Sequence, residues 1–215
     1  MSLFSIIDFL AIFAGALGGA AETARDERER YDIVGVVGLG LVAALGGGVT
    51  RDLLLGRGAP LAFTDVRYLL FALAGAFCGL LLHHEFNRIA RALLFIDAAA
   101  LGLFAVAGST RAVDAGLTTV PALLLGAITA AGGGAIRDVI AGRRPSIFLP
   151  GQPYVLVALF ASAVFLGLRA GGFSAQWCTI AGCLTGFIFR MLAVKLNYST
   201  RAVSRIPKAT SASDG

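Results

Sequence analysis

The amino-acid sequence predicts an all-α membrane protein with seven transmembrane helices, in which two inverted three-helix repeats are followed by a seventh helix. The first indication is composition, because 57% of the 215 residues are hydrophobic and only 14% are charged, against about 25% charged in an average soluble domain. The second is a mean hydropathy of +0.82 together with 28 glycines, which is typical of closely packed membrane helices. The third is an internal repeat. A soluble enzyme and a disordered protein are therefore excluded.

The spans follow from the length of the apolar segments, since a helix needs about 20 mostly apolar residues to cross a bilayer core. Seven segments meet this requirement: 3–21, 33–55, 66–82, 92–108, 117–141, 153–168 and 173–196. The links between them are short, so residues 1–196 are expected to form a single transmembrane domain. Within it, repeat one covers about 3–82, repeat two about 92–168, and the seventh helix about 173–196. The polar residues 199–215 are expected to form a disordered cytoplasmic tail.

The orientation follows from the distribution of the 18 lysines and arginines, which are enriched on the cytoplasmic side of membrane proteins. On the predicted spans, eleven lie on the side of the C-terminus, four lie on the other side, and three lie within spans. The C-terminus is therefore expected in the cytoplasm and the N-terminus outside. Because topology explains the basic excess, no nucleic-acid partner is expected.

The internal repeat is the most informative feature of the chain. The stretch from Gly40 to Arg57 recurs 86 residues later, from Gly126 to Arg143. Each copy holds three consecutive glycines followed at the same spacing by Arg-Asp: Gly46, Gly47, Gly48, Arg51 and Asp52 in the first, and Gly132, Gly133, Gly134, Arg137 and Asp138 in the second. Each repeat holds three spans, an odd number, so the second copy must enter the membrane from the opposite side. Inverted repeats are common in transporters, whose permeation site lies between the two halves.

The glycine triplets are expected to break the second and fifth spans. Each glycine costs a helix about 1 kcal/mol relative to alanine, and a break inside the bilayer must face protein or a water-filled cavity. Carbonyl groups freed at the breaks could replace part of a cation's hydration shell. Residues 46–48 and 132–134 would then form two successive constrictions on one path through the protomer. The alternative is that the glycines only allow close helix packing.

The Arg-Asp pairs after the triplets are functional candidates because ionisable residues inside a membrane are rare and costly. The aspartates, Asp52 and Asp138, are expected near the positive N-terminal ends of short half-helices that start after the breaks. The arginines, Arg51 and Arg137, are expected to pair locally or to line a vestibule. Anchoring at the membrane interface is the alternative role.

Asp8 and Asp97 lie near the starts of the first and fourth spans, 89 residues apart. Gly19 and Gly108 have the same offset, so the match extends along both helices. The two carboxylates either cap their helices and bind backbone groups nearby, or attract cations at opposite mouths of a pore.

The sequence contains no pattern that indicates enzymatic chemistry. It has no nucleophile elbow, no phosphate-binding loop after a strand and no metal-ligand spacing. Its cysteines, Cys78, Cys178 and Cys183, all lie in apolar stretches, which argues against a disulfide framework or a zinc site. No catalytic residue, metal or cofactor is expected.

The doubled Gly-Gly-Gly-x-x-Arg-Asp motif, each copy preceded by an Asp-headed helix, resembles the prokaryotic trimeric intracellular cation (TRIC) channel family, long catalogued as the UPF0126 bacterial membrane proteins. The resemblance covers essentially all of residues 1–196. It implies a homotrimer in which each protomer has its own pore, lined by second and fifth helices kinked at the triplets. It also implies passive conduction of monovalent cations, chiefly potassium, in a prokaryotic plasma membrane. The implied partners are potassium and sodium ions, membrane lipids and further copies of the chain.

Two departures limit what the resemblance implies. Animal members carry a Lys-Glu-Val type sequence after a glycine triplet, associated with phosphoinositide binding, whereas this chain has Val-Thr-Arg-Asp and Ala-Ile-Arg-Asp. Phosphoinositide regulation is therefore not carried over. Some bacterial relatives have been linked to glycine transport, so a secondary carrier for a small neutral solute is the alternative function. A structural or lipid-binding membrane protein is a third reading.

Overall fold

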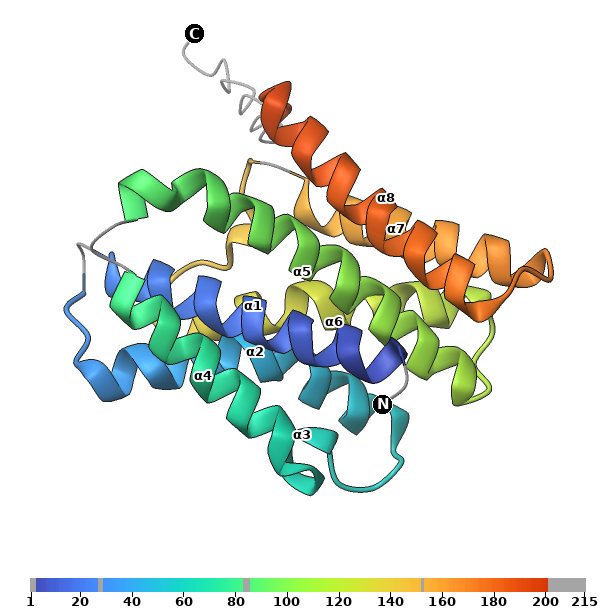
Figure 1. Cartoon of the computed structure of the whole chain (residues 1–215), viewed down its shortest axis with the longest axis horizontal. Coiled ribbons are helices and arrows are strands. Elements are labelled where there is room, and N and C mark those ends of the chain that lie inside the picture. Colours follow the sequence, from blue (N-terminus) through green and yellow to red (C-terminus); the bar gives the residue numbers. More distant parts are fainter. Residues whose placement is uncertain (1–2, 27–28, 83–85, 152, 201–215) are drawn as a thin grey trace, which may run out of the picture.

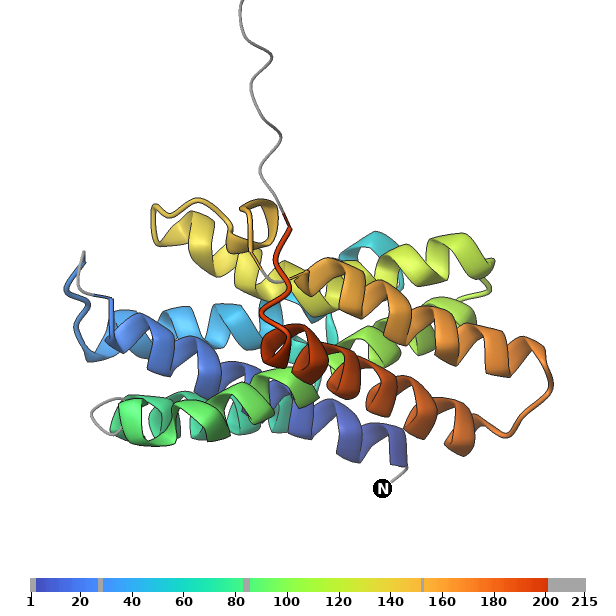
Figure 2. The same ribbon diagram turned by 90° about the horizontal axis from the view of Figure 1, so that it is seen from above.

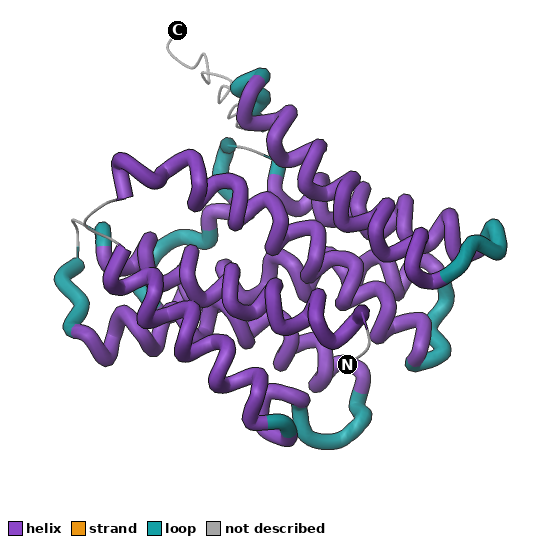
Figure 3. The backbone as a smooth tube through the Cα atoms, viewed as in Figure 1, coloured by secondary structure: helices purple, strands orange, loops and turns teal. Residues whose placement is uncertain are grey.

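The computed structural model describes residues 3–26, 29–82, 86–151 and 153–200, which form a bundle of helices without strands (Figures 1 and 3). The helices are α1 Leu3–Ala24, α2 Ile33–Leu55, α3 Leu61–Thr64, α4 Val66–Leu82, α5 Phe86–Asp114, α6 Thr119–Ile140, the 3-10 helix η2 Ser146–Phe148, α7 Tyr154–Ala170 and α8 Ala175–Lys195. The predicted all-α class is confirmed. The expected disordered tail lies outside the described residues from position 201 onward.

Five of these helices, α1, α2, α5, α6 and α8, are long and apolar enough to cross a membrane. The other two apolar helices, α4 and α7, each have 17 residues, which is about the lower limit for a spanning helix. Large apolar side chains cover the outside of the bundle, among them Leu81, Val120 and Trp177, each at least two-thirds exposed. Such an exposed apolar surface suits lipid rather than water.

The helices lie roughly along one axis (Figures 1 and 2). Figure 1 shows that α1, α4, α6 and α8 run in one direction, and that α2, α5 and α7 run in the other. Each helix of the second set of three, α5 to α7, therefore runs opposite to its sequence counterpart in the first set. Because α1 and α8 run in the same direction, the start of α1 and the end of α8 face opposite ways along the bundle (Figure 1).

The glycine triplets do not break their helices, contrary to the sequence-based expectation. Residues 33–55 and 119–140 are continuous α-helix through both triplets. The triplets instead mark the place where α2 and α6 cross. A Cβ on Gly47 would lie 2.1 Å from the carbonyl oxygen of Thr129, and a Cβ on Gly133 would lie 2.1 Å from that of Ala43. Only glycine therefore allows the two backbones to approach this closely, and helical hydrogen bonds are kept intact.

The repeats make matching contacts. Gly19 of α1 packs against Gly40 and Ala43 of α2, while Gly108 of α5 packs against Gly126 and Thr129 of α6. These α2 and α6 positions are 86 residues apart, and the two glycines that they contact are 89 residues apart. The sequence repeat is therefore accompanied by equivalent helix packing.

The glycine at the end of each repeated motif ends a helix. Gly56 has φ +62° and donates its N–H to the carbonyl oxygens of Asp52 and Leu53. Gly142 has φ +68° and donates its N–H to Val139. A left-handed residue at this position satisfies carbonyl groups of the last turn, and glycine adopts this conformation without steric cost.

Candidate functional site

The first Arg-Asp pair lies at the end of α2 and is almost completely buried. The Arg51 Nε donates to Asp52 Oδ1 at 2.8 Å, and the Arg51 side chain is only 3% exposed. The other oxygen of Asp52 accepts the backbone N–H of Leu61 at 3.0 Å. Asp52 therefore joins α2 to the start of the short helix α3. The predicted half-helix after a break in α2 is absent, because α2 is continuous. The Asp52 carboxylate, expected at the start of that half-helix, instead lies at the start of α3.

The second pair repeats this arrangement at the end of α6. The Arg137 Nη2 contacts Asp138 Oδ1 at 2.7 Å, and Asp138 Oδ2 accepts the N–H of Ser146, the first residue of η2, at 3.0 Å. Arg137 has a further partner in Glu22 of α1, whose two oxygens lie 2.7 and 3.1 Å from Nη1 and Nη2. This bidentate pair connects the two repeats and compensates the buried guanidinium charge.

The Asp8 and Asp97 carboxylates each accept a hydrogen bond from a tyrosine of the third long helix in the same repeat. The Tyr68 hydroxyl donates to Asp8 at 2.5 Å, and the Tyr154 hydroxyl donates to Asp97 at 3.2 Å. Asp97 also accepts from Arg190 of α8 at 3.3 Å. The sequence analysis missed both tyrosines, although their 86-residue separation, equal to that of the glycine motifs, was a usable signal.

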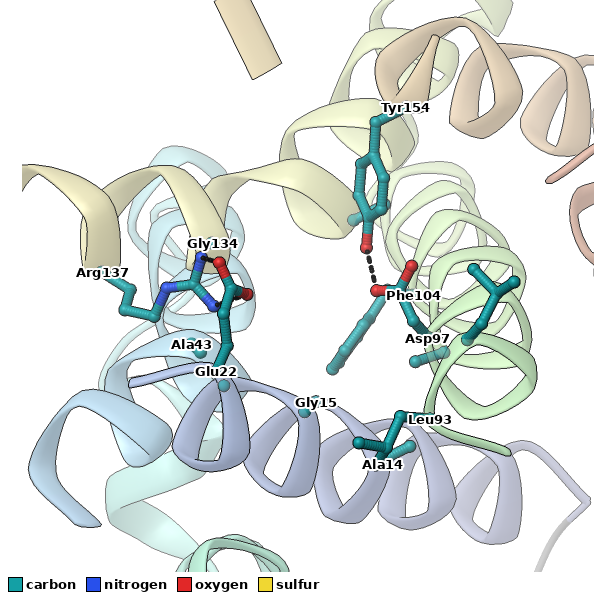
Figure 4. A pocket seen from close by; sticks show the side chains of 15 residues that line it. Ala14, Gly15, Glu22, Ala43, Leu93, Asp97, Phe104, Gly134, Arg137 and Tyr154 are labelled. Atoms are coloured by element: carbon teal, nitrogen blue, oxygen red, sulfur yellow. Dashed lines mark hydrogen bonds and ion pairs between the residues drawn. The ribbon is translucent and has the colours of Figure 1, made fainter. Parts of the chain in front are cut away.

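Two adjoining cavities of about 330 and 510 Å³ lie between α1, α5, α6, α7 and α8. The two cavities are together called the wide cavity. Six lining residues are common to both: Glu22, Asp97, Ala130, Gly134, Arg137 and Tyr154. Figure 4 shows the Arg137–Glu22 pair on one side of this space and the Tyr154–Asp97 hydrogen bond on the other. The cavity extends to Ser146 and Pro150 in the link between α6 and α7.

The corresponding residues of repeat one line a much smaller space. This narrow cavity has a volume of about 20 Å³ and is lined by Asp8, Gly48, Arg51, Tyr68 and, among others, Asp52. A space of that size holds about one water molecule. It reaches Leu61 and Ala62 of α3, so the two cavities extend toward opposite ends of the bundle (Figure 1).

Two carboxylates and two guanidiniums line the wide cavity. The carboxylates are Glu22 and Asp97, and the guanidiniums are Arg137 and Arg190. Every one of these groups has an opposite charge within 4 Å, which limits the cost of placing it among apolar helices. The net charge of these four lining groups is zero, so the cavity presents carboxylate and guanidinium partners in equal number.

The structure divides the predicted site residues into two groups. Seven line the wide or the narrow cavity: Asp8, Gly48, Arg51, Asp52, Asp97, Gly134 and Arg137. The others lie at the helix crossing or beside an arginine: Gly46, Gly47, Gly132, Gly133 and Asp138. Glu22 and Arg190 also line the wide cavity but were not predicted, since neither belongs to the repeated motif.

Metal chemistry has no candidate in the described part of the chain. No group of three or more His, Cys, Asp or Glu residues there could hold a metal ion. Cys78, Cys178 and Cys183 are all free thiols. The site is therefore a polar, ion-paired space between helices.

Solved channel structures share this fold. A TRIC cation channel superposes with a TM-score of 0.86 at 29% sequence identity, covering 95% of this chain and 99% of the channel. The TRIC trimeric intracellular cation channel orthologue from Rhodobacter sphaeroides gives a TM-score of 0.82 at 33% identity, covering 91% and 99%. The fold and its cavities therefore define a multi-pass helical membrane protein with the TRIC-channel architecture.

The chain belongs to the family whose model is described as Glycine transporter, which matches residues 5–84 and 94–170. A UPF0126 membrane protein of Deinococcus radiodurans is 32% identical over 202 residues, covering 94% of this chain and 92% of the relative. Another, from Bacillus subtilis, is 33% identical over 175 residues, covering 79% and 83%. These relatives and structures are membrane proteins and channels rather than enzymes, which confirms the resemblance and the non-enzymatic class.

Proposed function

We propose that this chain forms a channel for monovalent cations, chiefly potassium, in the plasma membrane of a prokaryote, with one pore in each protomer of a homotrimer. The observation that carries the proposal is the pair of cavities on either side of the α2–α6 crossing, each lined by an aspartate and an arginine of one repeat. The TRIC names of the structural neighbours support cation conduction and trimer formation.

We further propose that α1, α2 and α4 to α8 are seven transmembrane helices, that the repeats are inverted, and that the C-terminus is cytoplasmic. The opposite directions of α1 and α5 support the inversion (Figure 1). The positive-inside rule supports the orientation, because α1, α6 and α8, which run in one direction (Figure 1), end at or just before Arg25, Arg143 and Lys195. The helices α2 and α7, which run in the other direction, end near only Arg57 and Arg169. The wide cavity would then open toward the cytoplasm.

The test is a planar-bilayer recording of the purified protein under a potassium gradient, with a variant that fills the wide cavity. A Cβ on Gly134 would have no atom within 4 Å, so Gly134→Leu should fill the cavity without separating helices. We expect unitary currents that reverse near the potassium equilibrium potential and that Gly134→Leu abolishes. Gly38→Leu is the matched control, since Gly38 is equally uncrowded and lines none of the cavities described. Undiminished current in Gly134→Leu would contradict the proposed path.

A carrier for glycine is the second candidate, and two observations favour it. The family description names glycine transport, and the wide cavity presents both carboxylates and guanidiniums, which suit the two ends of a zwitterion. A carrier would show saturable counterflow of labelled glycine in liposomes and no unitary currents. Counterflow that Gly134→Leu abolishes, in a protein without currents, would replace the channel proposal.

A further inference from the structure

One aromatic side chain, Phe104 of α5, lies between the two cavities and lines both. Its residue exposure is only 8%. The ring extends from α5 toward Gly15 of α1 (Figure 4). A Cβ on Gly15 would lie 3.0 and 3.3 Å from two ring carbons of Phe104, and 3.4 Å from the Cα of Ala44 in α2. The ring therefore fills the space where α1, α2 and α5 meet.

Phe104 also interrupts the correspondence between the repeats. At the 89-residue offset that relates α1 to α5, its counterpart is Gly15, the residue that its ring contacts. Other lining residues near Phe104 have the same type in both repeats. Ala44 of the narrow cavity corresponds to Ala130 of the wide cavity, and Gly48 corresponds to Gly134. A large side chain on one side is thus opposed by a glycine on the other.

We infer that Phe104 is the barrier between the two cavities, an apolar constriction that solutes must pass on their way through the protomer. This inference rests on the proposed permeation path. An apolar ring offers a cation or its water no polar partner, and hydrophobic constrictions of this kind close a path by excluding water. The narrow cavity beyond the ring holds about one water molecule in its 20 Å³, so a hydrated cation has no room until the ring moves.

Removing the ring should connect the cavities. The readout is the modification of a single introduced cysteine by a membrane-impermeant thiol reagent added from the side on which the wide cavity opens. Gly134→Cys reports on the wide cavity and Gly48→Cys on the narrow one. With Phe104 in place, we expect the reagent to modify the cysteine of Gly134→Cys and not that of Gly48→Cys. Adding Phe104→Ala should raise the rate at Gly48→Cys by about tenfold or more, because water and reagent then cross the constriction.

Phe95→Ala is the matched control for the ring deletion. Phe95 lies on the same helix, is 48% exposed and packs against Phe187, and it lines neither cavity. Its loss should leave the Gly48→Cys rate unchanged. The native thiols Cys78, Cys178 and Cys183 also react with the reagent. Their rate is measured in the protein without an introduced cysteine and is subtracted.

Phe104→Val keeps an apolar side chain at the site and serves where the alanine variant does not yield a folded oligomer. We expect it to raise the Gly48→Cys rate by a smaller factor. Equal rates in the parent and in a folded Phe104 variant would overturn the inference and leave Phe104 as a packing residue.

Potassium flux into liposomes separates this inference from the proposed function. If both hold, Phe104→Ala should pass potassium several-fold faster than the parent and Phe95→Ala should not. Absence of potassium flux in every variant, combined with faster Gly48→Cys modification in Phe104→Ala, would reject the channel and keep the barrier. Faster flux without any change in modification would place the permeation path elsewhere and reject the barrier.

Discussion

Alanine substitutions within the glycine triplets should distinguish the helix crossing from the cavity wall. A Cβ on Gly47 or Gly133 would lie 2.1 Å from a carbonyl oxygen of the opposing helix, against about 3.4 Å for ordinary contact, so α2 and α6 must separate by about 1.3 Å. Overpacking of this kind costs about 1–3 kcal/mol. A Cβ on Gly48 or Gly134 meets no atom closer than 3.8 Å, so alanine there should gain up to about 1 kcal/mol of helix propensity.

The free energies of unfolding of the four single variants should therefore fall into two pairs. Unfolding in mixed detergent micelles with increasing dodecyl sulfate, followed by far-ultraviolet circular dichroism, measures this difference. Gly47→Ala and Gly133→Ala should be less stable than Gly48→Ala and Gly134→Ala by about 2 kcal/mol or more. Equal stability of all four would refute the tight crossing and would return the triplets to their expected role as helix breaks.

Two further predictions concern the carboxylates. Tyr68→Phe should lower the free energy of unfolding by about 1–3 kcal/mol in the same titration, because the buried Asp8 loses its tyrosine donor. Tyr154→Phe should cost less, because Asp97 keeps a guanidinium partner on α8, and the reverse order would contradict these pairings. Asp97→Asn should reduce the single-channel potassium conductance at low ionic strength by about fivefold, the effect of about 1 kcal/mol of lost attraction. That reduction should fade in concentrated salt, so a reduction that does not depend on salt would point to altered shape instead.

The segments and their pairing could be predicted because they depend on local composition and on self-similarity. The predicted second and third spans, 33–55 and 66–82, have the bounds of α2 and α4, since charges and glycines end these apolar segments clearly. The repeat likewise identified the Arg-Asp pairs before any contact was known. Both kinds of information are contained in the order of the residues along the chain.

The role of the glycine triplets could not be predicted, because it depends on a partner far away in the sequence. Glycine weakens an isolated helix, which favoured a break, but it also permits close helix contact. The choice is decided by Thr129 and Ala43, whose carbonyl groups lie where side chains on Gly47 and Gly133 would be. Nothing in the local sequence of either helix indicates this reciprocal contact.

Differences between the repeats, rather than their similarities, account for the unequal cavities. At the 89-residue offset, α1 carries Gly15 and Glu22 where α5 carries Phe104 and Arg111. Glu22 pairs with the arginine of the α6 motif, whereas Arg111 lines a separate cavity of about 150 Å³ together with Asp52, the aspartate of the α2 motif. At the second of these two positions, each repeat thus carries a charge opposite to that of the motif residue beside it. The helix crossing is therefore common to both halves, whereas the residues that differ between α1 and α5 lie at the cavities on which the two halves differ.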